Sequence, residues 1–179
     1  MMYLTCLLTY MYLQDEGIHP DVITYTSLLK ACGINGCDGT VVLAEEIFAQ
    51  MQQKTNHFSN TVEPTELTFQ RLMQAHVRAP EGQVDTARVW ELLDDMVKRG
   101  LRPGVVSYRA CVKAAAIDGD VDRSLAMLLV IRDRSRIGFD FRSWQAVAYL
   151  CAMTDRKEDE FRLRREIEER NTLIGTKAQ

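Results

Sequence analysis

The sequence predicts an all-α fold, a right-handed α-solenoid built from antiparallel helix pairs. Every periodic segment of the 179-residue chain places apolar residues at the three- and four-residue steps of a helix. No segment shows the sustained alternation of a strand, and most connections are short. The third observation is a repeated boundary. Gly17 and Gly100 can each end a helix in the left-handed conformation, and Pro20 and Pro103 follow three residues later, where a new helix can begin.

The composition limits the class of protein. An apolar content of 46% is enough to bury a core, so the chain is not expected to be disordered. The net charge of −3 provides no bulk basic field to attract phosphate backbones, so any nucleic-acid binding has to be local. Residues 1–13 are apolar but shorter than the roughly 20 residues of a membrane span, and we expect a helix that faces the core.

No metal site and no cofactor are expected. The cysteines form no Cys-x-x-Cys pair, and the histidines are scattered over different predicted elements. The thiols are therefore expected to be small buried side chains in a reducing compartment. The residues concerned are Cys6, Cys32, Cys37, Cys111, Cys151, His19, His57 and His76.

The first elements follow from caps and periodicity. Residues 1–16 are expected to form a helix, either the second helix of an incomplete preceding repeat or a cap on the array. Asp21 is the expected N-cap of a helix that runs to Cys32. Residues 33–39 contain three glycines and are expected to form a turn, and a further helix follows over residues 40–53.

The later helices alternate with short breaks. Thr65 is a suitable N-cap for a helix that ends near Arg78. From residue 154 to residue 171 the composition changes to mixed charge with three apolar positions, which is typical of a solvated helix that caps a stack. The intervening helices are expected over residues 84–99, 105–117, 121–137 and 142–153.

Four aromatic residues mark equivalent points of a repeat. They are Tyr25, Phe69, Tyr108 and Trp144, and their separations are 44, 39 and 36 residues. The expected organisation is an incomplete repeat over residues 1–16, a helical-repeat domain over 17–153 and a charged capping helix with a tail over 154–179. The repeat units within the domain are expected near residues 22–65, 66–104, 105–140 and 141–153.

The units have a common internal pattern. A short run at the start of the first helix leads to the aromatic residue, and the second helix begins after a turn, at Gly82 in one unit and Gly119 in the next. The units begin at Val22, Glu66, Val105 and, more weakly, near Phe141. This pattern resembles the pentatricopeptide repeat family over roughly residues 1–153. Tetratricopeptide repeats are helix pairs of similar length, but the Gly-x-x-Pro boundary followed by a β-branched pair and an aromatic residue favours the pentatricopeptide repeat.

The resemblance implies an organellar location and, commonly, single-stranded RNA binding at one base per repeat. In the family, a base is read by the residue after the aromatic residue together with the last residue of the repeat. The corresponding pairs here are Thr26 with Thr65, Gln70 with Gly104 and Arg109 with Asp140, while Gln145 has no assignable partner. The apolar neighbours that would sandwich a base are Ile23, Leu67 and Val106, and one turn further along the same faces lie Lys30, Gln74, Lys113 and Tyr149.

Two functions compete for this surface. The preferred hypothesis is a non-catalytic helical-repeat scaffold, an accessory protein-binding subunit of a larger organellar assembly such as a ribosome, an RNA-processing complex or a bioenergetic complex. The acidic net charge, the small number of repeats and the departure of the reader pairs from the family's usual residues favour it, and the apolar neighbours fit packing between first helices equally well. The alternative is a sequence-selective, single-stranded RNA-binding protein that uses the concave face in organellar RNA metabolism. Both hypotheses place the protein in a mitochondrion or chloroplast, soluble or peripheral in an assembly, without a transmembrane segment.

Catalysis is not expected. No histidine or cysteine stands in a motif with a base and an orienting group, and the acidic pairs fit solvated helix faces. The glycine-rich residues 33–36 lack the lysine and the preceding strand of a phosphate-binding loop. The sequence therefore predicts neither catalytic residues nor a small-molecule substrate.

Overall fold

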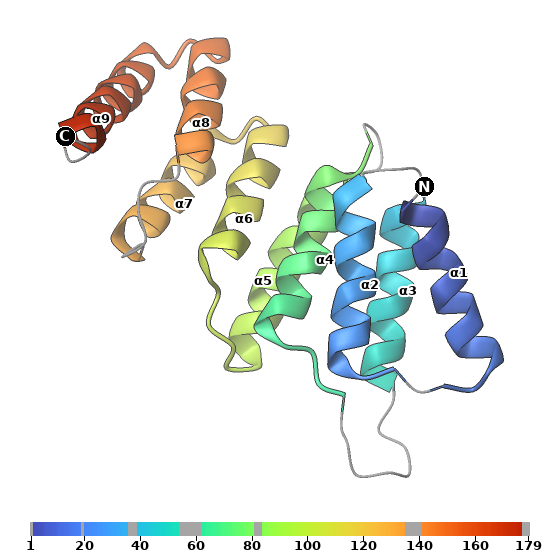
Figure 1. Ribbon diagram of the computed structural model, residues 1–179. Helices are drawn as coiled ribbons and strands as arrows, with labels where there is room; N and C mark the ends of the chain where they lie inside the picture. Colours follow the sequence, from blue (N-terminus) through green and yellow to red (C-terminus); the bar gives the residue numbers. More distant parts are fainter. Residues whose placement is uncertain are drawn as a thin grey trace. The chain divides into compact units, whose positions relative to one another are not determined.

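The computed structural model describes residues 2–18, 20–35, 39–53, 62–80, 84–134 and 141–176. Over these residues the chain forms nine helices and no strand, which confirms the all-α fold class (Figure 1). None of the described helices is long and apolar enough to cross a bilayer. The helices are α1 (Met2–Asp15), α2 (Val22–Asn35), α3 (Thr40–Gln53), α4 (Glu66–Arg78), α5 (Thr86–Lys98), α6 (Val105–Ile117), α7 (Val121–Arg134), α8 (Phe141–Met153) and α9 (Lys157–Thr176).

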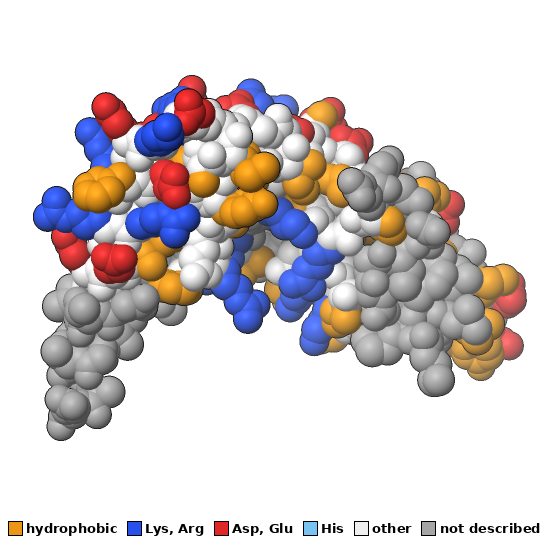
Figure 2. Space-filling view, turned by 90° about the horizontal axis from the view of Figure 1, so that it is seen from above, with side chains coloured by type: hydrophobic (Ala, Val, Ile, Leu, Met, Phe, Trp, Pro, Cys, Tyr) orange, Lys and Arg blue, Asp and Glu red, His pale blue; other side chains and the backbone are white. Residues whose placement is uncertain are grey.

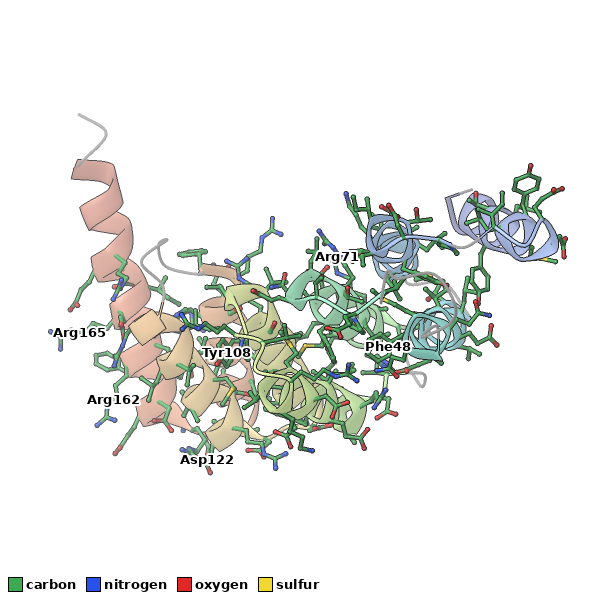
Figure 3. The ribbon with its side chains drawn as sticks, turned by 90° about the horizontal axis from the view of Figure 1, so that it is seen from below. Phe48, Arg71, Tyr108, Asp122, Arg162 and Arg165 are labelled. Carbon is green, nitrogen blue, oxygen red and sulfur yellow. The ribbon has the colours of Figure 1, made fainter. Side chains whose placement is uncertain are left out.

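The first compact unit, Met1–Ser107, is a stack of antiparallel helices. Helix α2 packs against α1, α3 and α4, and α4 also packs against α3 and α5. Tyr25 and Phe69 are fully buried near the starts of α2 and α4. The ring of Phe48, labelled in Figure 3, meets Phe69 edge to face with 5.3 Å between centroids, so α3 closes the core from the second-helix side.

The second compact unit is Tyr108–Gln179. In this unit α8 packs against both α7 and α9. Trp144 of α8 is buried, as are Leu163 and Ile167 on the narrow apolar stripe of α9. Helix α9 begins at Lys157 and continues to Thr176, whereas the sequence predicted a helix over residues 154–171. The four aromatic residues of the repeat pattern, Tyr25, Phe69, Tyr108 and Trp144, are all buried, which confirms that they occupy core positions.

The helix ends confirm most of the boundary signals. Gly17 and Gly100 have φ angles of +62° and +72°, and the next residue in each case donates its backbone N–H back to the fifth residue before it, Ile18 to Leu13 at 3.0 Å and Leu101 to Met96 at 2.9 Å. The carboxylate of Asp21 accepts from the backbone N–H of Thr24 at 2.7 Å, as an N-cap does.

The end of α2 differs from the sequence prediction. Residues 33–35 were expected in a turn, but α2 continues to Asn35. The cause is the packing of α4: a Cβ built on Gly33 would lie 3.4 Å from the backbone N of Ala75 and from the carbonyl oxygen of Arg71. The missing side chain lets two helix backbones approach, and Arg78 donates to the carbonyl of Gly33 at 3.1 Å.

The cysteines behave as buried thiols where the structure describes them. Cys32, Cys111 and Cys151 are buried and belong to no disulfide. Burial raises the pKa of Cys111 to about 12, so this thiol stays protonated at neutral pH. The side chains of Cys6, Cys37, His19 and His57 lie outside the described part of the chain.

Candidate nucleic-acid interface

A groove of about 380 Å³ lies between α2 and α4, within the first unit. Its apolar part includes Ile23 and Leu67, whose side chains are 74% and 45% exposed. The cations Lys30 and Arg71 line the same groove, and Figure 3 labels Arg71 on the side of α4 that faces α2. The other lining residues are Val22, Thr26, Ser27 and Thr65. Two aliphatic surfaces beside two positive charges can pack against a flat base and neutralise its phosphate.

The predicted pair Thr26 and Thr65 meets at this groove through a residue that the sequence did not single out. The hydroxyl of Thr26 donates to the carbonyl of Val22 at 2.7 Å and lies 3.3 Å from the hydroxyl of Thr68. The same Thr68 hydroxyl lies 3.1 Å from that of Thr65, with which it forms a capping box on α4. Because its own proton is directed to Val22, the Thr26 hydroxyl can only accept in its contact with the Thr68 hydroxyl, and Thr26 is buried.

The second predicted pair, Gln70 and Gly104, is also brought together. A Cβ built on Gly104 would lie 3.2 Å from Nε2 of Gln70 and 2.5 Å from Oε1 of Glu66. Nε2 of Gln70 donates to Oε1 of Glu66 at 2.6 Å. Sequence reasoning missed Glu66, although its position four residues before Gln70 on a helix was the available signal.

The remaining predicted residues lie on α4, α6 and α8. The side-chain oxygen of Gln74 accepts from Arg71 at 3.0 Å, which fixes the guanidinium against α4. On α6, Val106 is partly buried, and Arg109 and Lys113 follow at helical steps with exposed side chains. On α8, Gln145 is exposed and Tyr149 is 67% exposed. The third reader pair is not described, because Asp140 lies outside the described residues.

Charges of both signs lie on the face of the molecule that Figure 2 shows. Figure 2 shows basic and acidic side chains interspersed, with hydrophobic side chains exposed between them. Two exposed cations on α9 belong to ion pairs within the helix, Arg164 with Glu160 and Arg165 with Glu169. Attraction to a polyanion therefore depends on individual cations such as Lys30 and Arg71 rather than on the net charge of −3.

A separate cluster of charged residues joins α3, α4 and α5. Glu45 accepts from Nε2 of His76 at 2.8 Å and from Nε and Nη2 of Arg88 at 2.8 and 3.1 Å. Burial alone would raise the pKa of Glu45, but the hydrogen bonds and charges of His76 and Arg88 outweigh it and lower the pKa to about 2. His76 is 2% exposed, and the cluster joins three helices of the first unit. Among the described residues no group of three or more histidine, cysteine or acidic side chains could hold a metal ion.

Tandem antiparallel helix pairs with buried aromatic residues and a groove between successive first helices define an α-helical-repeat protein. The comparisons with known proteins identify the repeat. Residues 10–78 match the model of the pentatricopeptide repeat domain family. Over these residues the chain resembles the pentatricopeptide repeat family in sequence.

Two relatives show the extent of the similarity. A mitochondrial pentatricopeptide repeat-containing protein of Arabidopsis thaliana is 31% identical over 107 residues, which are 60% of this chain and 22% of that protein. The chain thus matches about a fifth of the length of that relative. The crystal structure of the pentatricopeptide repeat domain of Arabidopsis thaliana protein-only RNase P 1, in complex with tRNA, superimposes with a TM-score of 0.73. That match covers 93% of this chain and 81% of the domain at 18% identity, and it establishes similarity of fold.

Proposed function

We propose that this chain is a non-catalytic module that binds single-stranded RNA along the first helices of its repeats. The observation that carries the proposal is the groove between α2 and α4, where exposed Ile23 and Leu67 lie beside Lys30 and Arg71. Covering aliphatic side chains that are exposed to this extent with a base lowers the free energy of the complex. The two cations can contact phosphates of the same RNA strand. The fold shared with a domain solved in complex with tRNA supports this choice.

Fluorescence anisotropy with labelled single-stranded RNA, double-stranded RNA and single-stranded DNA tests the proposal. We expect single-stranded RNA to bind and Leu67→Asp to weaken binding about tenfold, because the substitution removes an apolar contact and adds a negative charge beside phosphate. Val97→Asp is the matched control, since Val97 is 59% exposed but belongs to α5, a second helix. Equal affinities of the Leu67 and Val97 variants would contradict the assignment of the groove.

We also propose that the protein acts in a mitochondrion, where its Arabidopsis thaliana relative is named as residing. Recovery of the tagged full-length protein with another cell compartment would contradict this proposal.

A second candidate function is that of an accessory subunit in an organellar assembly. It is supported by the second unit, where Tyr149, Met153 and Phe161 are each between 67% and 69% exposed. Large exposed apolar side chains are typical of protein contacts. Co-purification of the tagged protein after Phe161→Asp substitution tests it, and recovery of the same partners by the variant would count against α9 as the contact.

A further inference from the structure

The gap left by the missing side chain of Gly104 is filled by the carboxylate of Glu66. Gly104 has no positive φ that would require glycine, so its role lies in the space that it leaves. A Cβ at this position would lie 2.5 Å from Oε1 of Glu66, a separation that real Cβ atoms do not show. Glycine at residue 104 therefore permits the position of the Glu66 carboxylate on the first turn of α4.

The hydrogen bond from Gln70 fixes which atoms remain available. A carboxylate only accepts, so the amide nitrogen of Gln70 must be the group that faces Glu66, at 2.6 Å. Two carboxylate oxygens provide about four acceptor positions, and this bond uses one. Among the residues that the structure describes, Glu66 has no cationic partner, and both side chains are only partly buried. The carboxylate is thus oriented, accessible and mostly unsatisfied.

The chemistry of the bases decides what such a carboxylate would select. Two oxygens side by side accept best from two adjacent N–H groups, and guanine alone has them on its Watson–Crick edge, as N1–H and the N2 amino group. Adenine and cytosine place an acceptor next to their amino group, and uracil places its one N–H between two carbonyls. Leu67, the residue next to Glu66 on α4, is 45% exposed and can contact the face of the same base.

We propose that Glu66 is a specificity-determining residue that selects guanine in the bound RNA. Its carboxylate is oriented by the hydrogen bond from Gln70 and occupies the space that Gly104 leaves. This inference rests on the proposed RNA-binding function. The acidic group that faces the base comes from the first residue of α4 rather than from the boundary residue 104. Each part has a separate role: Glu66 accepts, Gln70 orients, and Gly104 provides space.

Selection from a random pool of short single-stranded RNAs, followed by sequencing, tests the inference. We expect guanine to be enriched at one position with the wild-type chain, by about tenfold over the other bases, as for a bidentate contact to a base. Glu66→Gln should abolish this enrichment, because the amide adds a donor where guanine also donates. Gly104→Ala should abolish it as well, although the carboxylate is retained, because the added Cβ displaces Glu66.

Glu63→Gln is the matched control, because it removes the same charge from an exposed carboxylate three residues earlier. It should keep the guanine enrichment. Circular dichroism of each variant separates loss of selection from loss of folding. Binding of the pool without guanine enrichment, or with enrichment that survives Glu66→Gln, would overturn the inference while the proposed function stands. Absence of any RNA binding would overturn both.

Discussion

Glu45 shows how single residues stabilise the first unit. Its carboxylate joins three helices, because it lies on α3 and accepts hydrogen bonds from His76 on α4 and Arg88 on α5. The three residues are far apart in sequence, so neither periodicity nor a motif predicts their contact. The packing of α3 and α5 against α4 creates it. The contact is stabilising only while Glu45 is ionised.

Glu45→Gln is expected to destabilise the first unit by about 2 kcal/mol at pH 7, because it replaces charge-assisted hydrogen bonds by neutral ones. The pKa of Glu45 is lowered from 4.5 to about 2 in the folded state. Its contribution is therefore complete above about pH 4.5 and is lost as the pH falls towards 2. Urea denaturation at a series of pH values should show the difference between wild type and variant shrinking over this range.

Glu91→Gln is the control for this experiment. Glu91 also pairs with Arg88, at 2.9 Å, but its side chain is 65% exposed. An exposed pair of this kind contributes about 0.5 kcal/mol or less. Equal destabilisation by the two substitutions would show that burial of Glu45 is not what gives the contact its strength.

The residue scale also shows where sequence reasoning succeeds. The N-caps Asp21 and Thr65 were predicted because their role depends on residues three positions away. Two pairs of the candidate interface, Thr26 with Thr65 and Gln70 with Gly104, were named from the sequence, and their role in binding stays a prediction. The linking residues Thr68 and Glu66 were not among them, because their importance depends on which atoms the neighbouring helix brings within hydrogen-bond distance.

At the scale of elements, helix ends in the second unit use two different residues for the same turn. After α6, Gly119 has a φ of +73° and Asp120 donates its backbone N–H to Ala115 at 2.9 Å. After α8, Asp155 has a φ of +56° and Arg156 donates to Cys151, also at 2.9 Å. The left-handed conformation costs a residue with a side chain about 1 kcal/mol, which glycine avoids.

Gly119→Ala is therefore expected to destabilise the second unit by about 1 kcal/mol, measured by chemical denaturation. No atom lies within 4 Å of a Cβ built on Gly119, so the cost would be conformational rather than steric. Asp155→Gly makes the reverse exchange in the same unit and should not destabilise it, because its ion pair with Lys157 is exposed on both sides. A loss of 1 kcal/mol in Asp155→Gly would contradict the equivalence of the two turns.

The existence and order of the helices were predictable because each is long and periodic, with a cap or a break at its ends. The end of α2 was not. Three glycines over residues 33–39 favour a turn by composition, but Gly33 is helical because the backbone of α4 lies against it. A single sequence does not distinguish a glycine that allows close helix packing from a glycine that allows a turn.

At the scale of the whole molecule, the net charge opposes RNA binding and the local charge of the groove favours it. The net charge of −3 repels a polyanion weakly, so binding requires particular cations. The chain forms two compact units, and the first contains Lys30 and Arg71 in the groove between α2 and α4. The sequence alone favoured a protein scaffold because of the acidic net charge, the small number of repeats and the departure of the reader pairs from the family's usual residues. The groove changes this preference, because it places two cations beside exposed aliphatic side chains.

The salt dependence of RNA binding should therefore change when either Lys30 or Arg71 is replaced. For single strands, each neutralised phosphate contributes about −0.7 to the slope of log K against log salt concentration. Lys30→Gln and Arg71→Gln are each expected to make the slope shallower by about 0.7, and the double variant by about 1.4 if each cation meets one phosphate. Arg162→Gln is the control, because it changes the net charge equally from an exposed position on α9, which Figure 3 labels. If Arg162→Gln changed the slope as much as Arg71→Gln, RNA would be responding to the charge of the whole molecule and not to the groove.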